Sequence, residues 1–520
     1  MVAAQAAPAA PVLEVRDLHK RYGGVRALRG VGFALARGQT YHLLGENGCG
    51  KSTLIKIVSG AEQPTSGTVL IDGVDRGALD PVTALAAGIE TVYQDLSLVP
   101  NLSVEENIGL TRQLMAGGGR LFQRIDRRLM RATTRAALAA VDLPGDASFL
   151  TRPVEDLPIA TRQLIAIARA IAGSAGLVIM DEPTTALTRR EVENLIRIVG
   201  RLHAEGVSVL FVTHKLDECL AIGGRALVMR DGQLVADCDL ARARKSDLSE
   251  LMTGRQINEG RYRPAGAELG AELLRVQGLH RRDAFAPVDF TLARGEVLGI
   301  TGLLDSGRNE LALALAGVRP ADGGAVWLDG RPLRLDSPRA AIAAGIGYVP
   351  EDRISEGLFL SKSIHDNVVM AVLDRLRNAF GLVRRAESRR IARQTVADLK
   401  VVAPDIDAPV QSLSGGNQQR VLIGRWLTIA PALLILHGPT VGVDVGSKDT
   451  IFRIVQDLAA KGMGVILISD DLPELIQNCD RVLVLHKGRI VAEPSGEDMT
   501  EEALYHAMGA GISRPGTVPA

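Results

Sequence analysis

The sequence predicts an α/β fold that occurs twice in tandem, each copy being a buried parallel sheet covered by helices. Three observations predict it. With 520 residues the chain is too long for one core, and about 150 residues per domain suggests two to four domains. A long internal repeat divides the chain into similar halves. Apolar residues make up 46% of the chain but aromatic residues only 3%, which is typical of parallel sheets packed from Ala, Leu, Ile and Val.

The internal repeat aligns the two halves over several separate segments. Residues 33–54, "FALARGQTYHLLGENGCGKSTL", match residues 290–311, "FTLARGEVLGITGLLDSGRNEL", without gaps. Residues 157–171 match residues 413–427 at nearly the same spacing. A period this long indicates a duplicated domain rather than a solenoid of short repeats. The expected organisation is a disordered tail over 1–11, a first domain over 12–255, a linker over 256–272, a second domain over 273–511 and a C-terminal tail over 512–520.

The composition excludes several classes of protein. Lys plus Arg and Asp plus Glu both number 60, a balance that offers no electrostatic footprint for nucleic acid, so no nucleic-acid partner is expected. Apolar stretches such as "WLTIAPALLIL", over 426–436, are well short of the roughly 20 residues that a membrane-spanning helix needs. The first residues, "MVAAQAAPAAP", lack the basic region of a signal peptide. Four scattered cysteines fit a reducing cytosol, and the sequence therefore predicts a soluble chain.

A glycine-rich loop in the first half predicts phosphate binding. Residues 45–53, "GENGCGKST", form the G-x-x-x-x-G-K-S pattern between an apolar strand and a helical segment, and the glycines let backbone N–H groups curl around phosphate. Lys51 would supply a charge to the β- and γ-phosphates, and Ser52 would place a hydroxyl on Mg²⁺. An ordinary glycine-rich turn is the alternative, which the Lys-Ser pair and the strand–helix context disfavour. The predicted nucleotide-binding residues of this loop are Gly45, Glu46, Asn47, Gly48, Cys49, Gly50, Lys51, Ser52 and Thr53.

Two acids and two rings complete the chemistry of the first half. The apolar strand "LVIMDEP", over 177–183, ends in Asp181, which would hold Mg²⁺ because a hard cation prefers oxygen ligands. Glu182 follows it and would orient or deprotonate the attacking water. His214 follows a second apolar strand and would contact the γ-phosphate, although a single histidine is more often structural. Tyr22, in "KRYGG", would stack on adenine, with core packing as an equally good explanation.

With these motifs in place, the chain resembles the ATP-binding subunits of ABC transporters. The deciding residues are "LSGGNQQR", over 413–420, which match the signature motif of that family. The resemblance implies two RecA-like P-loop ABC cassettes. Each cassette would have an antiparallel β lobe, near 13–36 and 274–294, and an inserted helical lobe, near 100–170 and 360–425.

The resemblance also implies roles for single residues. Gln94, in "YQDL", would be the Q-loop glutamine, which senses Mg²⁺ and the membrane partner. Asp181 and Glu182 would be the Walker B pair, and His214 the switch histidine. The expected catalytic residues are Lys51, Gln94, Glu182 and His214, and the expected Mg²⁺ ligands are Ser52, Gln94 and Asp181.

Three features narrow the resemblance to the double-cassette ATPases of monosaccharide importers, the ribose, galactose, arabinose and xylose class. They are the two fused cassettes, the segment "YVPEDR" over 348–353, and a weak second phosphate loop. The resemblance implies a peripheral subunit at the cytoplasmic face of the inner membrane. Its partners would be integral-membrane permease subunits and, indirectly, an extracytoplasmic sugar-binding protein. Nucleoside importers belong to the same class, so the substrate stays open.

In this family the two cassettes are expected to dimerise head to tail, within one chain or with a second copy. Each ATP would then lie between one phosphate loop and the signature of the other cassette. The first such site is complete, and it combines Lys51, Ser52, Gln94, Asp181, Glu182 and His214 with Ser414, Gly415, Gly416 and Asn417. Ser414 begins a helical run, so a helix N-terminus would face the γ-phosphate.

Every corresponding position of the second site is altered. These positions are Arg308, Asn309, Glu351, His437, Gly438 and Asp470, with "LPIAT" over 157–161 in place of the signature. His437 is a poor ligand for Mg²⁺, and Gly438 has no side chain to act as a base. Relatives usually keep Asp-Glu-Pro at the second Walker B, so the chain departs from its class here. Either this site keeps a structural or nucleotide-holding role, or it has drifted since the duplication.

Two other classes of double-cassette protein are disfavoured. A soluble ATPase that acts on ribosomes would usually have a long charged helical linker and two competent sites, whereas the linker here is short and contains Gly and Pro. A DNA-repair ATPase would need long coiled-coil insertions with sustained heptads, and none is present in the sequence.

Overall fold

The computed structural model describes residues 10–93, 95–116, 125–173, 175–184, 189–213, 215–256, 260–264, 266–303 and 305–509. The chain divides into two compact units, residues 1–257 and 258–520, and each is described here by itself.

A central sheet of six strands organises the first unit, in the order β10-β9-β3-β8-β7-β6. Neighbouring strands from β9 to β6 run parallel, and β10 pairs antiparallel with β9 at one edge. The strands are β3 (Thr40–Leu44), β6 (Ile89–Val92), β7 (Leu177–Asp181), β8 (Ser208–Val212), β9 (Arg225–Arg230) and β10 (Gln233–Asp239). Because the carboxyl ends of parallel strands meet at one edge, the loops after β3, β7 and β8 share that edge.

A second, antiparallel sheet has the order β2-β1-β4-β5. Its strands are β1 (Leu13–Tyr22), β2 (Val25–Leu35), β4 (Ser66–Ile71) and β5 (Val74–Asp75). The antiparallel lobe is therefore confirmed, but it is larger than the predicted range near 13–36. β4 returns after the phosphate-loop helix to pair with β1, a long-range pairing that the local sequence pattern did not reveal.

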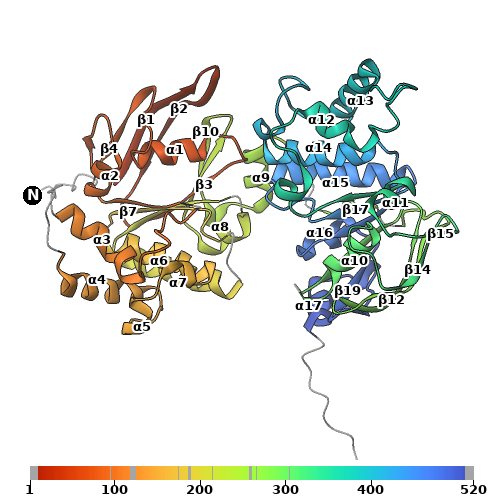
Figure 1. Ribbon diagram of the computed structural model, residues 1–520. Helices are drawn as coiled ribbons and strands as arrows, with labels where there is room; N and C mark the ends of the chain where they lie inside the picture. Colours follow the sequence, from red (N-terminus) through yellow and green to blue (C-terminus); the bar gives the residue numbers. More distant parts are fainter. Residues whose placement is uncertain are drawn as a thin grey trace, which may run out of the picture. The chain divides into compact units, whose positions relative to one another are not determined.

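Helices cover the central sheet of the first unit on both faces (Figure 1). They are α1 (Lys51–Val58), α2 (Pro81–Ala86), α3 (Val104–Ala116), α4 (Arg127–Ala140), α5 (Ala147–Leu150), α6 (Ile159–Ala172), α7 (Arg189–Ala204), α8 (Leu216–Ile222) and α9 (Lys245–Thr253). Alternate residues of β7 enter different cores. Leu177 and Ile179 pack with α1 and the antiparallel sheet, whereas Val178 and Met180 pack with α3, α6 and α7.

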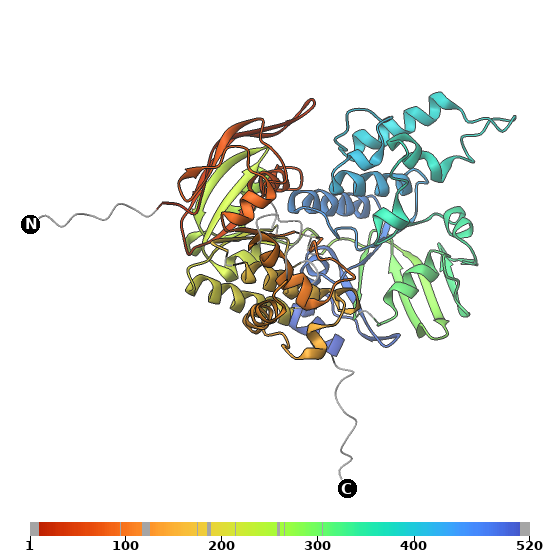
Figure 2. The same ribbon diagram turned by 60° about the vertical axis from the view of Figure 1, so that its left-hand side comes forward.

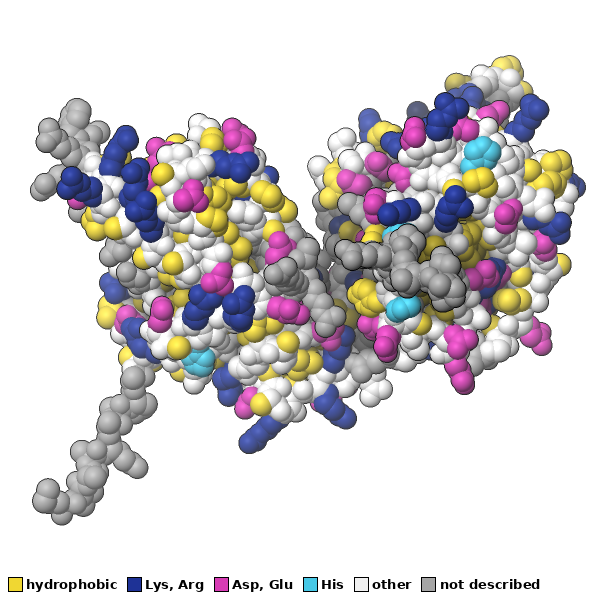
Figure 3. Space-filling model, turned by 90° about the horizontal axis from the view of Figure 1, so that it is seen from below, with side chains coloured by type: hydrophobic (Ala, Val, Ile, Leu, Met, Phe, Trp, Pro, Cys, Tyr) yellow, Lys and Arg dark blue, Asp and Glu magenta, His cyan; other side chains and the backbone are white. Residues whose placement is uncertain are grey.

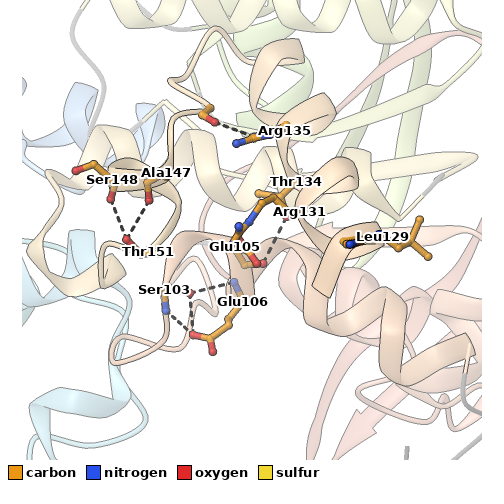
Figure 4. Close-up of polar contacts among 12 residues, drawn as sticks. Ser103, Glu105, Glu106, Leu129, Arg131, Thr134, Arg135, Ala147, Ser148 and Thr151 are labelled. Atoms are coloured by element: carbon orange, nitrogen blue, oxygen red, sulfur yellow. Dashed lines mark hydrogen bonds and ion pairs between the residues drawn. The ribbon is translucent and has the colours of Figure 1, made fainter. Parts of the chain in front are cut away.

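Polar contacts fix the helical lobe of the first unit (Figure 4). Ser103 and Glu106 form a reciprocal cap at the start of α3, with the Glu106 carboxylate accepting from the Ser103 N–H at 3.0 Å. Arg131 on α4 donates to the Glu105 carboxylate on α3 at 2.8 Å, and the Thr134 hydroxyl donates to the Glu105 carbonyl at 3.4 Å. These bonds join α4 to α3, and both helices pack on α6.

The second unit repeats the plan of the first. Its antiparallel sheet has the order β12-β11-β14-β15, and its central sheet the order β16-β17-β18-β13-β19-β20. The strands are β11 (Glu272–Arg281), β12 (Phe285–Ala293), β13 (Val297–Gly302), β14 (Gly323–Leu328), β15 (Arg331–Leu333), β16 (Ile346–Val349), β17 (Leu433–His437), β18 (Gly464–Ile468), β19 (Arg481–His486) and β20 (Arg489–Ala492).

The helices of the second unit also follow the first. They are α10 (Arg308–Leu315), α11 (Pro338–Ala343), α12 (Ile364–Val369), α13 (Arg385–Asp398), α14 (Gly415–Leu427), α15 (Val445–Ala460), α16 (Leu472–Asn478) and α17 (Glu501–Gly509). In Figure 2 the antiparallel strands of this unit are green, and the helices from α12 to α14 are cyan to blue. Together the two units confirm the predicted fold class, with a parallel core, an antiparallel lobe and a helical lobe in each.

Part of the segment expected to link the domains is packed on the second unit. Within residues 260–264, the Tyr262 hydroxyl donates to Asp449 at 2.9 Å, and the buried Arg263 pairs with Asp480 at 2.8 Å.

Opposite charges are interspersed over the face drawn in Figure 3, in keeping with the equal numbers of acidic and basic residues. Among the described residues no helix is long and apolar enough to cross a membrane.

Candidate active site

The first phosphate loop connects β3 to α1 and packs directly on neighbouring strands. A Cβ on Gly45 would clash with the Met229 carbonyl of β9, and one on Gly50 would lie 2.6 Å from the Ala27 carbonyl of β2. Gly50 is also left-handed, with φ 106°, where it caps α1. Only glycine fits these two positions, since any side chain would push the loop off the sheet. Around them Cys49 is buried, Glu46 and Thr53 are half-buried, and Asn47, Gly48 and Ser52 are exposed.

Lys51 lies at the centre of this loop. Its buried ammonium donates to the Gly45 carbonyl at 2.7 Å and to the Glu46 carbonyl at 2.9 Å. Gly50, which precedes it, has no side chain to cap α1, so N–H groups of the first helical turn are available to an anion. The exposed Ser52 hydroxyl stands beside them.

The two predicted acids lie at the carboxyl end of β7, at the same edge of the sheet. Burial and, to a smaller extent, the nearby Glu182 carboxylate raise the pKa of the Asp181 carboxyl to about 6, against the opposing effect of the Lys51 ammonium. Glu182 has a left-handed backbone, with φ 49°, and its N–H donates to the Val212 carbonyl at 2.8 Å. The structure therefore brings Asp181, Glu182 and Lys51 together.

The left-handed backbone at residue 182 is strained with glutamate there and would not be with glycine. We expect the free energy of unfolding of Glu182→Gly to be about 1 kcal/mol higher than that of Glu182→Ala. Both variants lose the carboxylate, and only Ala keeps a Cβ, which disfavours this backbone conformation. Urea denaturation followed by circular dichroism measures the difference. The same pair of changes at the exposed Glu205, which is not left-handed, should favour Ala instead. Equal stability of the two Glu182 variants would contradict the strain.

Three predicted positions need separate comment. Gln94 and His214 lie outside the described residues, as does 185–188 after the acids. Tyr22 ends β1 with its ring partly exposed, the Lys20 ammonium 4.9 Å from the ring centre, and its hydroxyl donating to Glu62. Stacking of this ring on adenine stays a prediction.

The signature residues form the start of α14 in the second unit. Ser414 is the exposed cap of this helix, and its hydroxyl accepts from the Asn417 amide at 2.9 Å. Asn417 is buried and also accepts from the Val402 N–H at 2.8 Å, which fits a role in holding Ser414. Gly416 has to be glycine, since a Cβ there would clash with Ser447 of α15. Gly415 is half-buried beside them.

The first unit has the same backbone where its signature is altered. Pro158 caps α6 with φ −56° and ψ 150°, compared with φ −62° and ψ 156° at Ser414. Both positions are exposed. The two signatures therefore differ in side chains rather than in main-chain conformation.

In the second phosphate loop Arg308 replaces Lys51 and keeps part of its bonding. The buried guanidinium donates to the Gly302 carbonyl at 2.9 Å, as Lys51 does to Gly45. It also forms an ion pair with Asp470, the residue at the position that corresponds to His214. The Asp470 carboxylate therefore already pairs with the charge of Arg308.

The remaining altered positions of this site also pair with each other. The Nε2 atom of His437 lies 3.4 Å from a carboxylate oxygen of Glu351, the residue that corresponds to Gln94. Burial lowers the pKa of His437, with Glu351 opposing that effect, and the Tyr348 hydroxyl lies 3.3 Å from its Nδ1. The sequence placed Arg308, Glu351, His437 and Asp470 in one site but did not show which of them pair.

Gly438 keeps the turn that Glu182 makes in the first unit. Its φ is 54°, and its N–H donates to the Ile468 carbonyl at 2.8 Å, the same bond as that from Glu182 to Val212. The backbone of the acid turn is thus conserved within the chain, while both acids are gone from the second copy.

A phosphate loop after β3, two acids at the end of β7 on the same edge of the sheet, and a glycine-rich helix start are the features of an ATP-binding cassette of the P-loop class. The protein-family model described as ABC transporter matches residues 28–185 and 285–441. The chain belongs to the ABC transporter family. It is an ATPase subunit coupled to transport, as the sequence predicted.

The relatives agree with the narrower resemblance. The chain is 42% identical to "Ribose import ATP-binding protein RbsA 1" of Rubrobacter xylanophilus, over 96% of this chain and 98% of that protein. It is 39% identical to the ribose import ATP-binding protein of Yersinia pestis, over 95% and 96%. A solved ATP-binding cassette of an ABC transporter in its ADP conformation has 22% identity and a TM-score of 0.40, covering 46% of this chain and 94% of its own.

Proposed function

We propose that this protein is the ATP-hydrolysing subunit of an importer for a monosaccharide, with ribose the first substrate to test. The observation that supports this most is the 42% identity to a ribose import ATP-binding protein across nearly the full length of both chains. Nucleoside import is the alternative within the same class. A ribosome-associated role is the alternative outside it.

Hydrolysis would use the side chains at the edge of the first sheet. Lys51 would exchange its bonds to the Gly45 and Glu46 carbonyls for β- and γ-phosphate oxygens, aided by the N–H groups that begin α1. Glu182 would orient the attacking water and accept its proton, with His214 and Gln94 beside it. Ser414 and the start of α14 would complete the site from the other cassette.

The donor set of the first site fits Mg²⁺. Ser52 and Asp181 offer oxygen ligands, and the Glu182 carboxylate raises the pKa of Asp181 by a repulsion that a bound cation would relieve. When bound, the cation would neutralise charge that develops on the phosphates. The second site does not fit it, since His437 is an imidazole with a lowered pKa in place of the acid.

We propose one competent site and one degenerate site in each chain. In the second site the polar side chains already pair with one another, Arg308 with Asp470 and His437 with Glu351. A ligand there would have to break these pairs. A structural role for this site therefore explains its pairing better than unconstrained drift.

Restoring the two lost acids should not revive the second site. In His437→Asp with Gly438→Glu, the new aspartate would face the Glu351 carboxylate, and a Cβ at 438 would lie 3.1 Å from the Glu351 Cγ. The effects on rate of catalytic groups that act as a unit are not additive, so we expect no ATPase activity above background. The measurement is phosphate release in a Glu182→Gln background. Recovery of more than about a tenth of wild-type turnover would show that these two residues alone silence the site.

The transport function is tested in cells that lack the gene. Uptake of labelled ribose should be lost, restored by the wild-type chain and not restored by Glu182→Gln. Galactose, xylose, arabinose and nucleosides tested in parallel identify the substrate. The permease subunits and the extracytoplasmic binding protein are the proposed partners, with the chain peripheral at the cytoplasmic face. Co-sedimentation with ribosomes, with uptake unchanged, would favour the alternative class.

A further inference from the structure

One arginine in the second unit, Arg353, contacts both the signature helix and the loop after β17. Arg353 begins a single π-helical turn, Arg353–Gly357, after β16. Its guanidinium donates to the Val441 carbonyl at 2.7 Å and to the Gly442 carbonyl at 3.3 Å, in the loop after β17. Its Nε donates to the Gln418 side chain of α14 at 3.4 Å. Three segments that are distant in sequence thus meet at one side chain.

Two glycines make room for this guanidinium. A Cβ on Gly415 of the signature would lie 2.7 Å from the Arg353 Nη2, and one on Gly442 would lie 3.4 Å from its Nη1. Gly442 also has φ 65°, which favours glycine. The arginine therefore packs against the signature backbone itself, as well as bonding to its neighbours.

The turn that bears Arg353 is held at both ends. At its start, the Asp352 carboxylate accepts from the Ile354 and Ser355 N–H groups at 2.9 and 3.0 Å. At its end, Arg425 of α14 donates to the Gly357 carbonyl at 2.5 Å. Because the main chain of this turn is fixed at both ends, the bonds of Arg353 tie α14 and the loop at 441–442 to a defined point of the fold.

The first unit has one of these arginines but not the other. Arg169 of α6, which corresponds to Arg425 in the repeat, donates to the Leu96 carbonyl at 3.1 Å and to the Ser97 carbonyl at 2.7 Å. Leu96 stands where the repeat places Arg353, and its buried side chain has no donor. The additional arginine thus occurs only in the unit whose signature is intact.

We propose that Arg353 is a positioning residue that fixes the Ser414–Gly416 start of α14 against the loop at 441–442. The proposal rests on the proposed function, in which these signature residues complete the ATP site of the first phosphate loop. Arg353 does not touch the nucleotide. It acts by holding the helix start in the one orientation that presents its N–H groups and Ser414 to the γ-phosphate.

The test is the ATPase activity and ATP affinity of full-length Arg353→Leu and Arg353→Lys. We expect turnover to fall about tenfold in Arg353→Leu, since small misplacement of catalytic groups costs one to two orders of magnitude. Affinity for ATP in a Glu182→Gln background should stay within about twofold, because the Lys51 loop is unchanged. Arg353→Lys should be intermediate, since one ammonium cannot reproduce the fork. Arg389→Leu removes a similar two-pronged arginine, paired with Asp407 on the surface, and should have wild-type turnover.

A second measurement separates positioning from folding. Guanidinium ions added to Arg353→Ala should restore part of the lost turnover, which a misfolded variant would not allow. Absence of rescue together with an unchanged melting temperature would overturn the proposal. So would wild-type turnover in Arg353→Leu while Ser414→Arg is inactive. Wild-type turnover in Ser414→Arg would instead overturn the proposed pairing of sites.

Discussion

ATP turnover is expected to fall at least about a hundredfold in Glu182→Gln, while ATP binding is retained. Glutamine has the same shape and keeps the turn at φ 49° with its N–H on the Val212 carbonyl, but an amide cannot accept the proton of the attacking water. A lost general base costs roughly 10²–10⁴ in rate. No second site should compensate, because Gly438 and His437 stand where the acids would be.

Phosphate release and ATP binding by calorimetry together measure this effect. The control is Glu205→Gln, an exposed acid in the loop before β8, which should match wild type in both measurements. Turnover of Glu182→Gln within a factor of two of wild type would remove Glu182 from its proposed role.

Ser414→Arg is expected to stop hydrolysis although Ser414 belongs to the second unit and Lys51 to the first. The substitution puts bulk and a misplaced charge at the start of α14, where an exposed hydroxyl should face the γ-phosphate. A loss of at least about tenfold is expected, since orientation alone is worth several kcal/mol. ATP binding to the Lys51 loop should persist.

Pro158→Arg is the matched control for this prediction. Pro158 and Ser414 cap corresponding helices with nearly the same φ and ψ, and both are exposed. Because Pro158 would face the degenerate site, its replacement should change turnover by less than about twofold. Equal losses in the two variants would show that the sites are paired differently.

The sequence predicted those parts of the molecule that depend on order along the chain. The repeat predicted two similar units, and the spacing from Gly45 to Lys51 predicted a strand, a phosphate loop and a helix. Asp181 and Glu182 follow a buried run, which placed them at the carboxyl edge of the sheet. In each case the pattern is local, and the position in the fold follows from strand direction.

The parts that could not be predicted are contacts between distant segments. Nothing near Arg308 in the sequence indicates Asp470 as its partner, and Glu351 gives no sign of His437. The role of Arg353 depends on the main-chain carbonyls of Val441 and Gly442, which every residue has and which no sequence pattern reveals. Such contacts depend on how the loops pack once the sheet has formed.

Glu182 in the first unit and Gly438 in the second make the same left-handed turn, and this similarity bears on whether the second copy could regain its acids. Glycine is less strained than glutamate at a left-handed position, so Gly438 is expected to be the more stable choice in a copy that does not need a base there. A Cβ at 438 would lie 3.0 Å from the Val441 side chain and 3.1 Å from the Glu351 side chain, so both side chains would have to shift to admit an acid there. Restoring hydrolysis would need changes at 437 and 438 together with others at this site, such as Arg308 and Asp470, so no single substitution is expected to restore it. The asymmetry between the two cassettes is therefore expected to persist in descendants of this protein.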